Sequence, residues 1–307
     1  RVVHGGEHFS GSVLINGEVL DCVRKCIELA PLHNPPNLAG IEAAQHLLPD
    51  CPQVAVFDTA FHATLPRHAY HYAIPREYYE KFGIRRYGFH GTSHRFVARG
   101  AEKLLGQPKH PDGHRLVTAH LGNGCSISAV KGGKCVDTSM GMTPLEGLVM
   151  GTRSGDVDPA LIEQLAERLG TNAQAVTGIL NKKSGLLGLS GLSNDMRDLL
   201  DSDEDHAQLA VNVFCYRLTK YIGAYAAAMG GLDAIVFTAG IGENSPAIRE
   251  KVCGSLGFLG AVIDPALNET GKGTRDISTA AATCRVLVVA TNEELLIARD
   301  TKELLEG

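Results

Sequence analysis

The apolar residues of this chain fall into short continuous runs separated by polar and glycine-containing segments. Runs of this kind occur at 54–57, 116–121, 126–130, 234–237 and 285–289, and they are typical of buried strands. The second and third flank a glycine-containing turn, which predicts a hairpin. The last two are each followed by a polar corner and a helical pattern. Strands that alternate with helices indicate an α/β fold.

Three segments carry apolar residues at helical spacing. The first covers residues 18–29, and the proline-rich segment 30–36 is expected to end it as a rigid loop, because proline removes a backbone donor. The second, 158–170, begins with an Asp-Pro pair and ends with glycine. The third, 211–229, presents one apolar stripe, which we expect either in the core or in a contact with a second copy of the chain.

Composition narrows the class of protein. The 307 residues suffice for two domains, and 44% hydrophobic with 21% charged residues is typical of a folded globular protein. A formal net charge of −5 argues against a nucleic-acid partner. No apolar run is long enough to span a membrane, and the eight cysteines form no CxxC pair. We therefore expect a cytoplasmic protein with reduced thiols.

Candidate chemistry lies in glycine-rich corners and in two cationic side chains. Corners at 120–124, 190–194 and 240–244 could bring backbone N–H groups against a phosphate, although none is a Walker A loop or a G-x-G-x-x-G motif. Each corner alone is more often a plain turn, but three together favour a nucleotide. His90 and Arg153 lie among small residues that allow close approach to a ligand. Single histidines and arginines usually have structural roles, so both interpretations stay open.

Eight motifs, in order along the whole chain, resemble those of the acetate kinase family. They are Arg1-Val-Val-His-Gly-Gly6, Pro31-Leu-His-Asn-Pro-Pro36, Phe57-Asp-Thr-Ala-Phe-His62, Gly88-Phe-His-Gly-Thr-Ser-His94, Ser139-Met-Gly-Met-Thr-Pro-Leu-Glu-Gly147, Gly151-Thr-Arg-Ser-Gly155, Phe237-Thr-Ala-Gly-Ile-Gly-Glu-Asn244 and Thr291-Asn-Glu-Glu294. Long polar, glycine-rich matches of this kind are far more specific than one short motif.

The resemblance implies the acetate and sugar kinase, Hsp70 and actin fold, in which two ribonuclease H-like lobes close over ATP and Mg²⁺. The implied reaction is the reversible transfer of a phosphoryl group from ATP to acetate. We expect residues 1–59 and 294–307 in an incomplete N-terminal lobe, and residues 60–293 in a C-terminal lobe that binds the nucleotide. The family forms homodimers through the C-terminal lobe, so a homodimer is expected here.

Carried over position by position, the resemblance also implies roles for individual residues. The catalytic residues would be Arg1, Asp58, His90 and Arg153. The small carboxylate would contact Arg1, Val3, Leu32, His33, Phe89 and Pro144. ATP would contact His120, Leu121, Gly122, Asn123, Gly124, Asp195, Met196, Arg197, Gly240, Ile241, Gly242, Glu243 and Asn244, and Mg²⁺ would be held by Glu293.

Some of these residues also fit simpler roles. Glu293 suits the first turn of a helix, where the macrodipole favours a carboxylate. Asp58 is given no proton-accepting role, because acetate has no proton to lose at neutral pH. The apolar residues of the acyl pocket would otherwise be read as core.

The chain differs from the family pattern at its start. Family members begin with a strand and an Asn-x-Gly-Ser-Ser-Ser-like phosphate loop, and no such segment precedes Arg1. We therefore expect either a truncated N-terminal lobe with impaired catalysis, or a portion of a working kinase.

Three functions stay open. The first is an acetate kinase. The second is a propionate-preferring relative, because one methylene gives only about 1–3 kcal/mol of discrimination. The third is a non-catalytic nucleotide-binding or dimerisation module.

Overall fold

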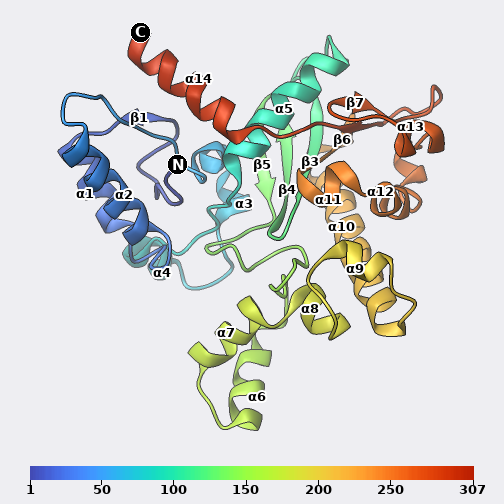
Figure 1. The fold of residues 1–307 in the computed structure, drawn as a ribbon, viewed down its shortest axis with the longest axis horizontal. Coiled ribbons are helices and arrows are strands. Elements are labelled where there is room, and N and C mark those ends of the chain that lie inside the picture. The colour runs from blue at the N-terminus through green and yellow to red at the C-terminus, as the bar shows by residue number, and fades with distance from the viewer.

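The computed structural model describes residues 1–307, and its centre is a six-stranded mixed sheet (Figure 1). The strand order is β5-β4-β3-β6-β8-β7. β3, β6 and β8 are mutually parallel, whereas β4, β5 and β7 pair antiparallel with their neighbours. The strands are β3 (Arg115–Leu121), β4 (Cys125–Lys131), β5 (Lys134–Thr138), β6 (Ala234–Thr238), β7 (Arg275–Asp276) and β8 (Arg285–Val288).

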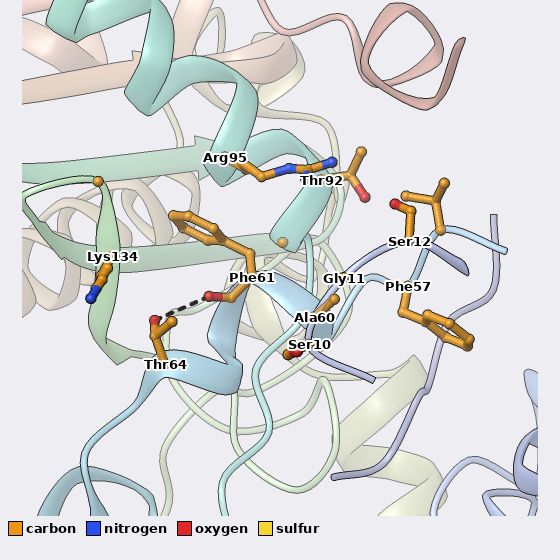
Figure 2. A pocket seen from close by; sticks show the side chains of 13 residues that line it. Ser10, Gly11, Ser12, Phe57, Ala60, Phe61, Thr64, Thr92, Arg95 and Lys134 are labelled. Carbon is orange, nitrogen blue, oxygen red and sulfur yellow. Dashed lines mark hydrogen bonds between the residues drawn. The ribbon is translucent and has the colours of Figure 1, made fainter. Parts of the chain in front are cut away.

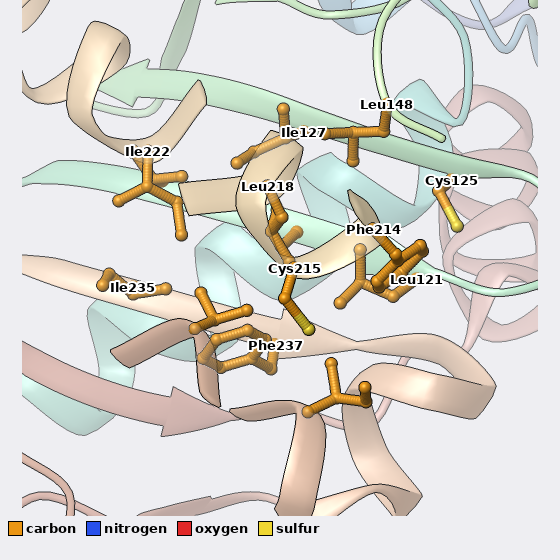
Figure 3. Packing of buried hydrophobic residues seen from close by; sticks show 14 of the residues in the cluster. Leu121, Cys125, Ile127, Leu148, Phe214, Cys215, Leu218, Ile222, Ile235 and Phe237 are labelled. Carbon is orange, nitrogen blue, oxygen red and sulfur yellow. The ribbon is translucent and has the colours of Figure 1, made fainter. Parts of the chain in front are cut away.

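The two faces of this sheet are covered by different helices, which confirms the predicted α/β alternation. Val117, Ile127 and Ile235 belong to a large core cluster on the side of α10 (Asp205–Met229). Figure 3 shows Ile127 and Ile235 in this cluster. Their neighbours along the strands pack instead against α5 (Gly91–Leu105) on the opposite face. Because successive side chains of a strand point to opposite faces, a strand covered on both sides must be apolar throughout, and all five residues of β6 are buried.

The predicted apolar stripe at 211–229 lies in the core. Phe214, Leu218 and Ile222 are at most 2% exposed and belong to the large cluster beneath the sheet. Within the chain, the stripe therefore packs in the core against the sheet, which is the first of its two interpretations.

The N-terminal segment forms a smaller unit beside the sheet (Figure 1). It contains the two-stranded sheet of β1 (Val13–Leu14) and β2 (Val54–Ala55), with α1 (Gly17–Lys25) and α2 (Asn34–Leu47) around its own apolar cluster. Three expectations were wrong in detail. The first helix ends at Lys25 rather than near residue 29, and the strand predicted at 54–57 is only two residues long, Val54–Ala55. Pro35 and Pro36 lie in the first turn of α2 instead of in a rigid loop, whereas Pro31 does lie in the turn that precedes the helix.

The helix predicted at 158–170 is present, but its apolar face is not buried. α6 (Ala160–Leu169) and α7 (Ala173–Lys182) form a hairpin that extends away from the sheet (Figure 1). No residue of α6 is buried, and Leu169 is 57% exposed. None of the helices is both long and apolar enough to cross a membrane, and all eight cysteines are free.

The remaining elements are short, apart from the C-terminal helix. They are η1 (Ala60–Thr64), α3 (Arg67–Tyr70), α4 (Arg76–Phe82), α8 (Gly185–Ser190), α9 (Met196–Leu200), α11 (Ala239–Asn244), α12 (Pro246–Cys253), η2 (Gly257–Leu259), α13 (Pro265–Glu269) and α14 (Glu293–Glu306).

Candidate active site

Polar residues gather where the three parallel strands end. His120 is near the end of β3, Ala239 follows β6, and Thr291 lies shortly after β8. The carboxyl ends of parallel strands share one edge of the sheet, so these segments come together although they are far apart in sequence. Ala239 and His90 are the two non-glycine residues with positive φ, at 63° and 56°. Such strained backbone is concentrated at functional sites.

His90 and Arg153 converge on Gly124, in the turn between β3 and β4. A Cβ atom added to Gly124 would lie 3.3 Å from Arg153 Nη2 and 3.4 Å from His90 Cε1. His90 caps the N-terminus of α5, whereas Arg153 belongs to a loop that follows β5. The side chains of two distant segments thus meet over a residue that has none.

Arg153 has no anionic partner in the structure. Its Nη1 donates to the carbonyl oxygen of Pro144 at 2.8 Å and contacts Met150 Sδ at 3.5 Å, and it takes part in no salt bridge. Burial lowers the pKa of its guanidinium. A partly buried guanidinium without a counter-ion has a strong electrostatic preference for an anionic ligand.

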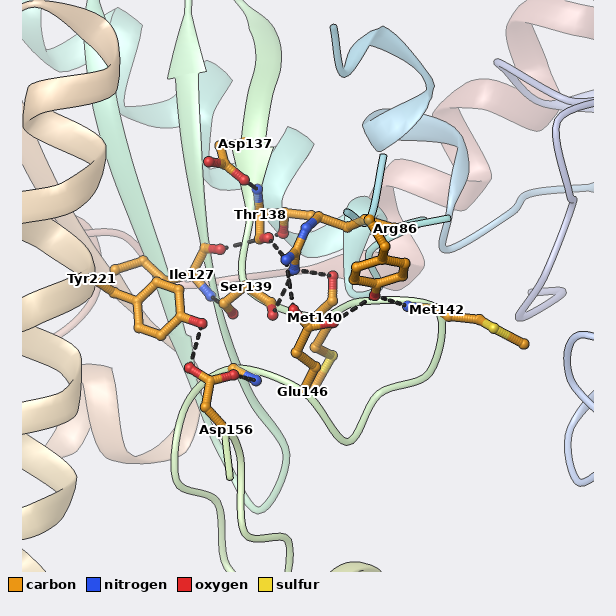
Figure 4. A network of polar contacts seen from close by, with 12 residues as sticks. Arg86, Ile127, Asp137, Thr138, Ser139, Met140, Met142, Glu146, Asp156 and Tyr221 are labelled. Carbon is orange, nitrogen blue, oxygen red and sulfur yellow. Dashed lines mark hydrogen bonds and ion pairs between the residues drawn. The ribbon is translucent and has the colours of Figure 1, made fainter. Parts of the chain in front are cut away.

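The loop that carries Arg153 is held by a polar network around Arg86 (Figure 4). Arg86 donates to the carbonyl oxygens of Thr138, Ser139 and Met140 and forms an ion pair with Glu146 at 2.5 Å. Tyr72 donates to the same carboxylate and accepts from a backbone N–H of the loop. The loop is therefore fixed from both sides before it reaches Arg153.

Arg1, Asp58 and Glu293 form a second charged group. Arg1 Nε lies 3.5 Å from an Asp58 oxygen, and Arg1 Nη1 lies 3.5 Å from a Glu293 oxygen. Thr92 donates to the other oxygen of Asp58 at 3.3 Å. Burial raises the pKa of Asp58 to about 6, although Arg1 opposes this shift. Asp58 and Glu293 thus place two carboxylates around one arginine, and carboxylate oxygens are ligands of the kind that Mg²⁺ uses.

Three neighbouring histidines are neutral. The rings of His90 and His120 are stacked, with centroids 4.2 Å apart, and His94 lies behind them. Burial lowers the pKa of His120 to about 4, and it lowers the pKa values of His90 and His94 well below their usual range. Burial therefore favours the neutral, hydrogen-bonding form of His90 over the cation.

A cavity of about 820 Å³ opens beside the Gly124 turn. Eight residues predicted to contact the nucleotide line it: Gly122, Asn123, Asp195, Met196, Arg197, Gly240, Ile241 and Asn244. The other five do not line it: His120, Leu121, Gly124, Gly242 and Glu243. Its volume is within the usual range of small-molecule sites, and a mixed polar and apolar lining suits a nucleoside.

Two residues behind this cavity hold its wall in place. The Glu243 carboxylate accepts from the backbone N–H groups of Ala239 and Thr291, at 2.9 and 3.2 Å, and so ties together the ends of β6 and β8. Arg249 is fully buried and donates to the carbonyl oxygens of Gly242 and Glu243 and to Asn268. Glu243 thus has a structural role here.

The residues predicted for the acyl group are only partly brought together. Phe89 is buried in the core and Val3 packs against it, whereas Leu32 is 80% exposed. His33 is close enough to Arg153 and Arg1 for their charges to lower its pKa, although burial is the larger cause. Pro144 is held at the site through its carbonyl bond to Arg153.

A second, smaller cavity is separate from these residues. It has a volume of about 100 Å³ and lies between the N-terminal segment, η1 and the start of α5 (Figure 2). Ser12 and Arg95 on its wall both bind Asp300 of α14. None of the predicted site residues lines it.

Several lining residues of the large cavity were missed by sequence reasoning. They are Leu200, Asp201, Ser245, Pro246, Ala247 and Glu269, whereas Asn194, which also lines the cavity, belongs to the corner 190–194 predicted to face a phosphate. Ser245 and Pro246 adjoin the motif that ends at Asn244, so extending that motif by two residues would have found them. Glu269 belongs to α13, and nothing in its local sequence connects it to the other segments.

Comparison with known proteins gives consistent matches over the chain. The family model described as the acetokinase family matches residues 1–299. An acetate kinase from Carboxydothermus hydrogenoformans is 57% identical over 307 residues, covering 99% of this chain and 77% of the relative. The chain belongs to the acetokinase family.

Solved structures agree. The crystal structure of Porphyromonas gingivalis acetate kinase has a TM-score of 0.95 at 52% identity, and the match covers 99% of this chain and 77% of that one. A propionate kinase from Francisella tularensis subsp. tularensis SCHU S4 has a TM-score of 0.92 at 47% identity, covering 99% and 78%. The expected acetate and sugar kinase, Hsp70 and actin fold is thereby confirmed.

Proposed function

We propose that this protein transfers the γ-phosphoryl group of ATP to acetate and forms acetyl phosphate and ADP. A carboxylate oxygen of acetate attacks the γ-phosphorus, and the bond from that phosphorus to the oxygen bridging to the β-phosphate breaks. The observation that carries the proposal is the convergence of His90 and of Arg153, which has no acidic partner, on Gly124, next to a cavity of about 820 Å³. The high identity to acetate kinases supports the choice of acceptor.

The residues of the site suit a reaction that depends on positioning and electrostatics. Arg153 and His90 would stabilise the charge on the planar phosphoryl group from one side. Arg1 would bind the carboxylate or the transferring group, with Asp58 fixing its guanidinium. The cavity would hold the nucleoside, and its phosphates would point towards Gly124, because Gly122 and Asn123 of the same turn line the cavity.

The same site fits Mg²⁺, which would offset the charge of the nucleotide phosphates. No three acidic, histidine or cysteine side chains come together as a ready-made metal site. Mg²⁺ commonly binds through one or two carboxylates together with substrate phosphates, however, and Glu293 provides one carboxylate with Asp58 close by. Glu293 would therefore hold the ion only when the nucleotide is present.

The test is to trap acyl phosphate as hydroxamate from ATP, Mg²⁺ and acetate, using the 307-residue chain. Arg153→Ala should lower kcat about a hundredfold or more, since this is what the loss of one preorganised donor costs. Arg76→Ala, which removes an exposed arginine from α4, is the matched control and should leave kcat unchanged. ATP binding without product in the wild type would refute the kinase proposal and favour a nucleotide-binding module.

Propionate is the second candidate acceptor, because a solved propionate kinase is also similar to this chain. Leu32 is largely exposed, so the predicted acyl pocket is not closed around its ligand. Its shape therefore does not exclude propionate, which is one methylene longer than acetate. The ratio of kcat/KM for the two acids in the same assay decides between them, and a preference for propionate would overturn the acetate assignment.

We also propose a cytoplasmic homodimer with the two lobes expected above. The separate apolar cluster of the N-terminal segment supports the division at residue 59, and the unburied apolar side chains of α6 support a contact outside the monomer. Light scattering coupled to size exclusion would give the mass, and a monomer at micromolar concentration would contradict the dimer.

A further inference from the structure

Behind His90 runs a chain of hydrogen bonds that none of the proposed roles uses. His90 Nδ1 lies 2.9 Å from Ser126 Oγ. Ser126 Oγ lies 2.7 Å from His94 Nε2, and His94 Nδ1 lies 2.8 Å from Thr118 Oγ1. His94, Ser126 and Thr118 are all fully buried, so the chain is shielded from bulk solvent.

The chain has two polarities in which the Ser126 hydroxyl both donates and accepts, because each shared hydrogen belongs to one side of its bond. If both histidines donated to Ser126 instead, the buried hydroxyl hydrogen of Ser126 would lose its acceptor in this chain, which is costly. In the first polarity, Thr118 donates to His94, His94 donates through Nε2–H to Ser126, and Ser126 donates to His90 Nδ1. His90 then carries its hydrogen on Nε2. In the reverse polarity His90 donates through Nδ1–H, every bond is inverted, and Thr118 donates to the Ser128 carbonyl oxygen at 3.5 Å.

The first polarity is favoured by the tautomers that it produces. It places both His90 and His94 in the Nε2–H form, which a free neutral histidine side chain also prefers. The reverse polarity places both in the Nδ1–H form, and in exchange it gains only the long bond from Thr118 to the Ser128 carbonyl. Since both rings are neutral, each has a tautomer to fix.

The tautomer matters because His90 Nε2 lies at the Gly124 turn. A Cβ atom added to Gly124 would lie 3.5 Å from His90 Nε2 and 3.3 Å from Arg153 Nη2. The Nε2–H form offers a hydrogen-bond donor to an anion at this position. The Nδ1–H form would direct a lone pair at it, which would repel a phosphoryl oxygen.

We propose that Ser126, supported by His94 and Thr118, is a positioning residue that fixes His90 as the Nε2–H tautomer, so that His90 donates a hydrogen bond to the transferring phosphoryl group. The part concerning the phosphoryl group rests on the function proposed above. The part concerning the tautomer does not, and it can be measured without substrate.

The tautomer is read by ¹⁵N NMR of the ligand-free protein labelled at histidine, with His90 assigned by comparison with His90→Gln. In the wild type, His90 should show a protonated Nε2 and an unprotonated Nδ1. In Ser126→Ala, a fraction of the Nδ1–H form should appear. The matched control is Ser128→Ala, which removes a buried hydroxyl from the same strand that bonds to Thr138 and not to the histidine chain, and it should leave the His90 signals unchanged.

The kinetic readout separates positioning from a general loss of structure. Ser126→Ala should lower kcat about tenfold, with the KM values for acetate and ATP within about twofold, because only a transition-state donor is weakened. Thr118→Val should act in the same direction, and Thr118→Ser, which keeps the hydroxyl, should restore kcat.

Either of two results would overturn the inference: a hydrogen on Nδ1 of His90 in the wild type, or unchanged His90 signals and kcat in Ser126→Ala. A wild type that makes no acyl phosphate at all would instead refute the proposed function, and the NMR comparison would still decide the tautomer.

Discussion

Gly124→Ala is the sharpest single test of the site geometry, because it adds one methyl group at the point where two proposed catalytic side chains meet. The new Cβ would lie 3.3 Å from Arg153 Nη2, 3.4 Å from His90 Cε1 and 3.5 Å from His90 Nε2. Gly124 is not among the glycines with positive φ, so alanine can adopt its backbone conformation. The substitution should therefore act only by filling the space between Gly124, His90 and Arg153 with a methyl group.

The expected effects on stability and on activity differ in size. Replacing glycine by alanine at a compatible position stabilises a protein by about 0.4–1 kcal/mol, while a tight contact costs about 1–3 kcal/mol, so the two partly cancel. For activity, the methyl group would occupy the position proposed for the phosphoryl oxygens and would remove at least one donor. That loss is about 3 kcal/mol in the transition state, or roughly a hundredfold or more in kcat.

The measurement combines urea unfolding with the hydroxamate assay. Gly178→Ala is the matched control, because Gly178 lies inside α7 and a Cβ atom added there would have no neighbouring heavy atom within 4 Å. This control should gain about 1 kcal/mol in unfolding free energy with kcat unchanged. A folded Gly124→Ala protein with wild-type kcat would refute the idea that the phosphoryl group lies between His90 and Arg153.

Two further predictions concern buried charge. Burial raises the pKa of Asp58 from 3.8 to about 6. Between these two pH values the folded protein keeps a proton that the unfolded chain has released. The free energy of unfolding therefore falls as the pH rises from about 4 to about 6, by roughly 3 kcal/mol in total. Asp58→Asn should therefore be more stable than the wild type at pH 8 and lose this advantage at pH 4 in urea unfolding; an equal difference at both pH values would contradict the argument. Arg249→Met should lower the unfolding free energy by about 3 kcal/mol and raise the KM for ATP more than that for acetate, since the carbonyl groups of Gly242 and Glu243 lose their donor. Equal changes in both KM values would show that Arg249 does not shape the nucleotide cavity.

Local sequence determined most of the central sheet. The apolar runs at 234–237 and 285–289 predict buried strands because a parallel strand is covered on both faces and has no polar positions. Pro35 and Pro36 were misread, because proline marks both the end of a helix and the first turn of one. Asn34, the first residue of α2, is fully buried and bonded to the backbone of His4, and this tertiary contact holds the start of the helix in place.

The sequence by itself also determined the family, through glycine-rich motifs whose residue types are constrained by close approach to a ligand. Only the tertiary structure decided which of these residues meet. It brought His90 and Arg153 to Gly124, left Arg153 without a counter-ion, and placed Arg249 behind the cavity wall. The physical reason is that motifs encode local backbone geometry, whereas burial, charge pairing and the direction of a hydrogen-bond chain depend on neighbours from distant segments.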